Sequence, residues 1–155
     1  MLMILLVMTV LLVDLGIKSA VEEAEPQEFP RKLDKSRGFI ILHRNHNDGF
    51  PMGVLRDKPD LVSMVPLMVV SAVAGVFLWL FPRKGQGGHK VGISLILGGG
   101  LSNLYDRLKR GYVVDYFSVN VKGLKKVVFN LGDIFIFLGT GILLAAELIE
   151  AKREH

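Results

Sequence analysis

The sequence predicts an all-α membrane protein with four transmembrane helices and a small extracytoplasmic β-rich element in the first loop. Half of the 155 residues are hydrophobic, and the mean hydropathy is +0.41. These apolar residues stand in long uncharged blocks and do not recur at amphipathic spacing, so they suit a lipid environment. The blocks leave no room for a separate soluble domain. We therefore expect one membrane domain over residues 1–155.

Four apolar blocks predict the helices. The longest, residues 61–81, has 21 residues and no charge, which matches the roughly 20 residues that cross a hydrocarbon core. The first block lacks the basic start of a signal peptide, and a spanning helix there must continue past Asp14 to Lys18, an i,i+4 pair on one helix face. Three consecutive glycines in the third block favour close helix packing. The expected helices are about residues 1–18, 61–81, 90–108 and 130–149.

The loop over residues 19–60 is the one stretch long enough to fold outside the bilayer. A β-branched apolar run at 38–42 predicts a short strand, and Asp48-Gly49 is a hairpin signal. We therefore expect a small sheet that lies against the membrane surface.

Charge and cysteine content limit the partners and the chemistry. The net charge of +4 and the pI near 9.4 come from lysines and arginines that flank apolar segments. Attraction to anionic lipid headgroups explains this better than binding to nucleic acid. The absence of cysteine excludes a thiol nucleophile and a thiolate metal site.

Two aspartates at the ends of apolar segments are the candidate functional groups. Asp115 lies in an apolar, aromatic run, where desolvation raises the pKa of a carboxyl group. Asp133 follows Asn130 by three residues at a helix start, so an N-cap pair is an alternative role. Asp106 and Arg107 have a similar alternative, as a solvated helix end at the headgroups. Carboxylates at membrane depth are costly and usually mark function.

Histidines and serine offer weaker candidates. His43 and His46 lie near Asp48, but a patch of exposed loop residues is the better interpretation, because no second ligand cluster exists; we expect no metal site. Ser102 follows the glycines of the third block. All histidines are expected in loops or in the tail, so this serine has no base to activate it, and close helix packing explains it better.

Four groups of polar and glycine residues occur along the chain in a set order. They are Asp14 with Lys18, Asn47-Asp48-Gly49, Asn103-x-x-Asp106-Arg107 with Gly111 and Asp115, and Phe129-Asn130-x-x-Asp133. Together they resemble the lipoprotein signal peptidase family, also called type II signal peptidase, over most of the chain. The chain departs from the family pattern in the loop, where Phe50-Pro51-Met52 replace its usual Ala-Ala-Phe, and at Gly132, where the family usually has Ala.

The resemblance implies a multi-pass enzyme of the bacterial inner membrane, an aspartic endopeptidase without a cofactor. Such an enzyme removes the signal peptide from diacylglyceryl-modified prolipoproteins by cutting before the lipidated cysteine. Its partners would be these substrates and membrane lipids, and we expect a monomer. By the same resemblance, Asp115 and Asp133 would be the catalytic residues, and the substrate-binding residues would be Asn47, Gly49, Asn103, Asp106, Arg107 and Asn130.

Two other interpretations stay open at this point. Tyr105-Asp106 and Gly132-Asp133 faintly resemble the motifs of presenilin-like and prepilin peptidases, although residue 130 is Asn where that pattern has Gly. A small non-enzymatic carrier with paired intramembrane carboxylates is the other.

The basic residues also bear on orientation. The family orientation places both termini in the cytoplasm, yet the two loops then outside carry eight and six lysines and arginines, against three and two inside. This distribution opposes the positive-inside rule.

Overall fold

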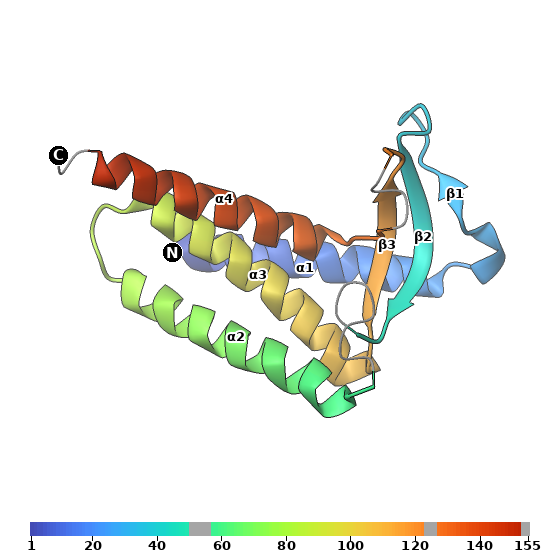
Figure 1. Cartoon of the computed structure of the whole chain (residues 1–155), viewed down its shortest axis with the longest axis horizontal. Helices are drawn as coiled ribbons and strands as arrows, with labels where there is room; N and C mark the ends of the chain where they lie inside the picture. Colours follow the sequence, from blue (N-terminus) through green and yellow to red (C-terminus); the bar gives the residue numbers. More distant parts are fainter. Residues whose placement is uncertain (50–56, 123–126, 153–155) are drawn as a thin grey trace.

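The computed structural model describes residues 1–49, 57–122 and 127–152. Across these residues four long helices run along one another, a small sheet stands across one end of them, and both Met1 and the last described residues lie at the other end (Figure 1). The elements in chain order are α1 (Leu2–Glu23), the 3-10 helix η1 (Pro26–Glu28), β1 (Arg31–Lys32), β2 (Ile40–Asn47), α2 (Pro59–Leu80), α3 (Gly87–Arg110), β3 (Val113–Val119) and α4 (Leu131–Ala151).

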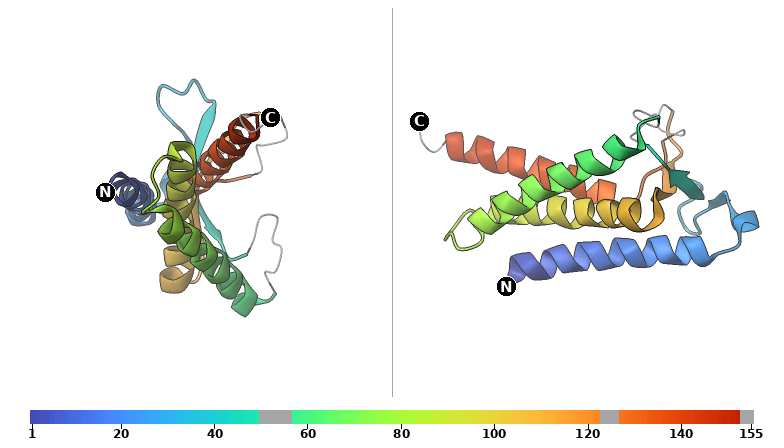
Figure 2. Two further views of the ribbon diagram at one scale, coloured as in Figure 1. Left: turned by 90° about the vertical axis from the view of Figure 1, so that its left-hand side faces the viewer. Right: turned by 90° about the horizontal axis from the view of Figure 1, so that it is seen from below.

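Helix α3 is the centre of the bundle. It packs against α1, α2 and α4, and the end-on view in Figure 2 places it among them. Among the described residues, α1, α2 and α4 are long and apolar enough to cross a membrane, whereas α3 does not meet that criterion. The physical reason is that α3 faces other helices on three sides, so small and polar side chains replace lipid-facing apolar ones. The expected membrane-type helical architecture is thus confirmed.

Paired glycines bring α3 and α4 close together. A Cβ added to Gly92 would lie 2.8 Å from the carbonyl oxygen of Gly139, and one added to Gly139 would lie 2.6 Å from the carbonyl oxygen of Gly92. About two helical turns away, a Cβ added to Gly99 would collide with the carbonyl oxygen of Gly132. Both contacts join backbone to backbone, so neither can relax through a side-chain rotation.

The sheet has three antiparallel strands in the order β1-β2-β3. Asn45 pairs with Asp115, and Asn47 pairs with Val113, with an irregularity in the register between Leu42 and Asn45. Paired residues point to the same face of a sheet, and so do residues two apart on one strand. The register therefore puts Asn45, Asn47 and Asp115 on one face.

The structure corrects several local expectations. The sheet is not confined to the first loop, because its third strand, β3, follows α3. This strand was not predicted from the sequence. Helix α1 continues to Glu23, beyond the expected end at residue 18. Strand β2 ends at Asn47 and pairs with β1 and β3. The segment after Gly49 that would complete the expected Asp48-Gly49 hairpin lies outside the described residues.

The expected loop positions of the histidines are also wrong for three of them. His43 and His46 lie in β2, and His89 lies in α3. The divergent loop residues Phe50, Pro51 and Met52 lie outside the described residues.

We predict that Gly99→Ala destabilises the bundle, because its methyl group would overlap the backbone of Gly132. Overpacking of this kind costs about 1–3 kcal/mol. Thermal unfolding in detergent should show a lower Tm for this variant. Gly141→Ala is the matched control, since no atom lies within 4 Å of its added Cβ. Equal Tm values for the two variants would contradict the close contact.

Candidate active site

Asn130 connects the two candidate aspartates. Its side-chain Nδ2 donates to Oδ1 of Asp115 at 2.7 Å. Its side-chain oxygen accepts from the backbone N–H of Asp133 at 2.9 Å, and its own backbone N–H donates to Oδ2 of Asp133 at 3.2 Å. The last two bonds form a capping box at the start of α4. The N-cap that the sequence suggested is therefore present, and the residue that caps the helix also reaches Asp115.

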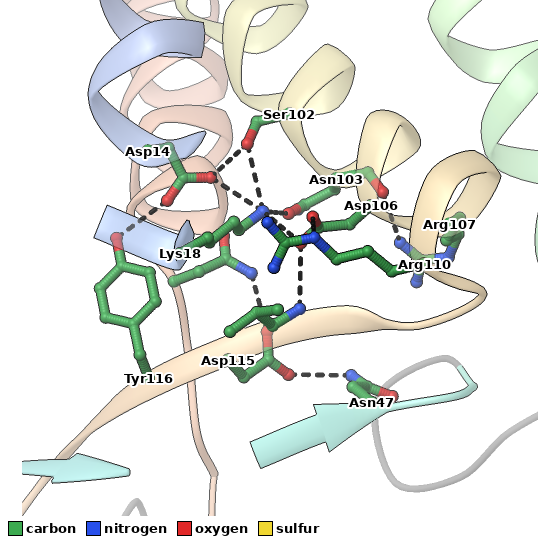
Figure 3. A network of polar contacts seen from close by, with 12 residues as sticks. Asp14, Lys18, Asn47, Ser102, Asn103, Asp106, Arg107, Arg110, Asp115 and Tyr116 are labelled. Carbon is green, nitrogen blue, oxygen red and sulfur yellow. Dashed lines mark hydrogen bonds and ion pairs between the residues drawn. The ribbon is translucent and has the colours of Figure 1, made fainter. Parts of the chain in front are cut away.

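Two further asparagines donate to the same carboxylates. Asn47 on β2 donates from Nδ2 to Oδ2 of Asp115 at 3.0 Å, and its Oδ1 accepts from the backbone N–H of Gly49 at 3.2 Å. Asn103 on α3 donates from Nδ2 to Oδ1 of Asp133 at 2.9 Å. Each aspartate thus receives an amide N–H on each of its two oxygens, and Figure 3 shows the bond from Asn47 to Asp115.

Arg107 joins the helix bundle to the segment after β2. Its Nη2 donates to the backbone oxygen of Gly49 at 3.2 Å, and its Nη1 lies 3.5 Å from the backbone oxygen of Asn103. Its charge also interacts with Asp115 and Asp133. The structure therefore brings together seven of the eight predicted site residues: Asn47, Gly49, Asn103, Arg107, Asp115, Asn130 and Asp133.

Burial dominates the protonation of Asp115. Its side chain is on β3, outside the helices, and the residue is 3% exposed. Desolvation raises the pKa of this carboxyl group to about 6, and the nearby Asp133 contributes in the same direction. The amides of Asn47 and Asn130 oppose the shift because they stabilise the charged form. A carboxyl group with this pKa exchanges its proton near neutral pH.

Asp106, the eighth predicted residue, lies in a separate buried cluster. It has no exposed surface, and its carboxylate lies 3.2 Å from Lys18 Nζ and 3.3 Å from Arg110 Nε. It also accepts from the backbone N–H of Val114 at 3.0 Å, which ties the start of β3 to α3. No bond from it to Asp115 or Asp133 is among the described contacts.

The cluster centres on the ammonium of Lys18 and includes groups that sequence reasoning missed. Asp14 Oδ2 lies 2.9 Å from Lys18 Nζ and accepts from the hydroxyl of Ser102 at 2.6 Å. Its other oxygen accepts from the hydroxyl of Tyr116 at 2.8 Å. Burial and Asp14 raise the pKa of Tyr116, so this hydroxyl remains a donor. The i,i+4 spacing of Asp14 and Lys18 was the sequence signal for this cluster, but it did not identify the partners.

The histidines serve other contacts. His43 Nε2 lies 2.8 Å from the hydroxyl of Ser118, and His46 Nε2 lies 2.8 Å from Glu22. Across the part of the chain that the structure describes, one group has metal-ligand spacing, formed by His89, Glu147 and Glu150. That group joins the N-terminal end of α3 to the C-terminal end of α4, far from the aspartates.

Comparisons with known proteins agree on one family. A family profile described as signal peptidase (SPase) II matches residues 6–149. The lipoprotein signal peptidases of Brucella ovis and Brucella canis are each 32% identical over 151 residues, with 96% of this chain and 91% of the relative covered. A bacterial membrane enzyme solved by the in meso method at 2.3 Å resolution has a TM-score of 0.83 at 22% identity, over 99% of this chain and 91% of the other, and so shares the fold.

We predict a pH dependence of stability that Asp115→Asn removes. The folded-state pKa of about 6 lies above the ordinary aspartate pKa of 3.8, so protonation of this group favours the folded state. The stabilisation of the folded state by protonated Asp115 is full below about pH 4 and is lost as the pH rises through 6. A difference of about two pKa units corresponds to about 3 kcal/mol.

The Tm in detergent should therefore fall between pH 4 and pH 7 more in the wild type than in Asp115→Asn. The exposed Asp34 provides the control, since Asp34→Asn should keep the wild-type pH dependence. If Asp115→Asn loses as much stability over this range as the wild type, Asp115 does not have a raised pKa.

Proposed function

Because the chain belongs to the signal peptidase II family, it is a protease that processes lipoprotein precursors, and we propose that it does so as an aspartic endopeptidase. Its substrates would be diacylglyceryl-modified prolipoproteins, cut just before the lipidated cysteine. The observation that carries the proposal is the pair Asp115 and Asp133, which Asn130 joins through bonds to both.

The proposed chemistry is general acid–base catalysis on a water molecule. Two adjacent carboxyl groups hold one proton between them, because like charges close together do not both ionise readily. The charged carboxylate takes a proton from water as the oxygen attacks the scissile carbonyl, and the protonated partner gives its proton to the carbonyl oxygen. Collapse of the tetrahedral intermediate then transfers a proton to the departing nitrogen. Asp115 and Asp133 supply both roles without a cofactor.

The other predicted residues would hold the peptide or the aspartates. We assign Asn47, Gly49 and Arg107 to the substrate side, since Arg107 and Gly49 connect the end of β2 to α3. Asn103 and Asn130 would orient the carboxylates, which receive their amide N–H groups. Asp106 would support the site from the buried cluster without touching the substrate, because both of its oxygens face other protein groups.

The proposed setting is the bacterial inner membrane, with four spanning helices and a monomeric enzyme. We include α3 as the fourth span because its 24 residues run beside the three apolar helices. The sheet and residues 19–60 would lie outside the cytoplasm, where exported precursors arrive. Acyl chains of the substrate would stay in the lipid while its peptide reaches the aspartates at the end of the bundle.

The alternatives from the sequence are not favoured. A family profile that matches residues 6–149 is that of signal peptidase II and not of a presenilin-like or prepilin peptidase. A non-enzymatic carrier has no place in a family of proteases. Neither alternative has a specific contact in its favour among the described residues.

The function is tested by cleavage of a lipidated precursor. Purified protein should shorten a diacylglyceryl-modified prolipoprotein in a gel assay and leave the unlipidated precursor intact, because the lipid holds the cleavage site at membrane depth. Intact lipidated substrate would refute the function. Equal cleavage of both forms would refute the lipid requirement.

We predict that Asp115→Asn and Asp133→Asn each lower kcat by roughly 10²-fold or more, because an amide does not exchange a proton as a carboxyl group does. Single-turnover cleavage of the lipidated precursor measures this. Asp34→Asn, a change of the same kind at an exposed carboxylate, should leave kcat unchanged. Near-wild-type turnover in either Asp115→Asn or Asp133→Asn would show that this aspartate is not catalytic.

We also predict the orientation, against the distribution of basic residues. Single cysteines introduced at Lys35 and Lys122 should react with a membrane-impermeant maleimide in intact cells, and one at Gln86 should not. The chain has no cysteine of its own to interfere. The opposite labelling pattern would place both aspartates at the cytoplasmic face and contradict the proposed access of exported substrate.

A further inference from the structure

The side chain of Asn103 has two ends of nearly the same shape, and its function depends on which end faces Asp133. The amide nitrogen has only donors and the amide oxygen has only acceptors. Lys18 Nζ lies 2.7 Å from Asn103 Oδ1. An ammonium has donors alone, so the oxygen must face Lys18. The nitrogen then faces Oδ1 of Asp133, at 2.9 Å.

Lys18 is itself fixed in position. Its side chain has no exposed surface, and its ammonium contacts acceptors from α1 and α3. These partners are Asp14 Oδ2 at 2.9 Å, Ser102 Oγ at 3.1 Å and Asp106 Oδ2 at 3.2 Å, in addition to Asn103 (Figure 3). The ammonium therefore has no room to turn away from Asn103.

The other two asparagine donors are oriented differently. The oxygen of Asn47 accepts from the backbone N–H of Gly49, and that of Asn130 accepts from the backbone N–H of Asp133. Neither of these donors can be removed by a side-chain substitution. Among the three, the orientation of Asn103 is the one that a mutation elsewhere in the chain can release.

We propose that Lys18 is a positioning residue for catalysis, whose buried ammonium orients the Asn103 amide so that an N–H, and not the oxygen, faces Asp133. The proposal rests on the proposed role of Asp133. Without Lys18 the amide is free to rotate, and its oxygen can then face Asp133. An amide oxygen only accepts, so this orientation requires that the carboxyl group of Asp133 is protonated and donates. On acidification, the charged carboxylate that accepts the proton from water would therefore be lost at a higher pH than in the wild type.

Several ionisable groups surround this contact and enter the design of the test. They are Asp14 on α1, Asp106, Arg107 and Arg110 on α3, and Asp115 and Tyr116 on β3. Lys18→Met alone would leave Asp14 and Asp106 buried without their cation, which endangers folding. The double variant Asp14→Asn/Lys18→Met removes one charge of each sign. Asp106 still has a cation beside it, because Arg110 Nε lies 3.3 Å from its carboxylate.

The experiment compares the double variant with Asp14→Asn alone, which retains Lys18 next to Asn103. Both are assayed for cleavage of the lipidated precursor across pH, and Tm in detergent reports folding. We expect the double variant to lose about tenfold in kcat/KM relative to Asp14→Asn, as for coupled neighbours in one hydrogen-bond network. The acid limb of its pH profile should move up by about one pH unit. Asp14→Asn alone should have an acid limb no higher in pH than that of the wild type, because it removes a nearby negative charge and keeps Lys18 next to Asn103.

A second pair of variants separates the amide from a direct effect of charge. In a background that carries both Asn103→Ala and Asp14→Asn, adding Lys18→Met should shift the pH profile much less than it does with Asn103 present. A shift of the same size in that background would mean that Lys18 acts on Asp133 by its charge and would overturn the proposal. An unchanged profile in the double variant with Asn103 present would overturn it too. If the wild type leaves the lipidated precursor intact, the proposed function fails instead.

Discussion

The buried ammonium of Lys18 is the interaction on which the sheet end of the molecule depends. Removal of such a charge from water is expensive, and it is tolerated only when several acceptors surround it. Those acceptors come from α1 and α3, and one of them, Asp106, also accepts from the backbone of β3 at Val114. A single charge thus dictates how the first helix, the central helix and the strand that carries Asp115 meet.

Around this centre the two aspartates share one pattern of contacts. Each carboxylate receives amide N–H groups, and the carbonyl oxygen of each donor asparagine is occupied by another group. Hydrogen bonds to both oxygens favour the charged form, whereas burial favours the neutral form. The two tendencies oppose each other at Asp115, where burial prevails and raises the pKa to about 6. A pair of groups suited to proton exchange results from this balance.

The sequence predicted the apolar helices well because length and hydropathy are local properties. The central helix α3 differs from the others in hydropathy. It was expected from its apolar residues and glycines, yet its hydropathy is below that of a typical span because α1, α2 and α4 cover it. The site motifs predicted which residues meet, but Asp106 belongs to the buried cluster, and the place of β3 was missed. Strand pairing with β2 and the partners of Lys18 join segments far apart in the chain, and no local pattern encodes them.

The glycine contacts between α3 and α4 have a mechanical consequence. Gly92 with Gly139 and Gly99 with Gly132 fix two points seven residues apart on each helix, so sliding or rolling of one helix would break both contacts together. Asn103 on α3 and Asp133 on α4 therefore belong to one rigid body. Their hydrogen bond is formed in the free protein, and in the proposed mechanism a bound peptide would spend no binding energy on assembling it.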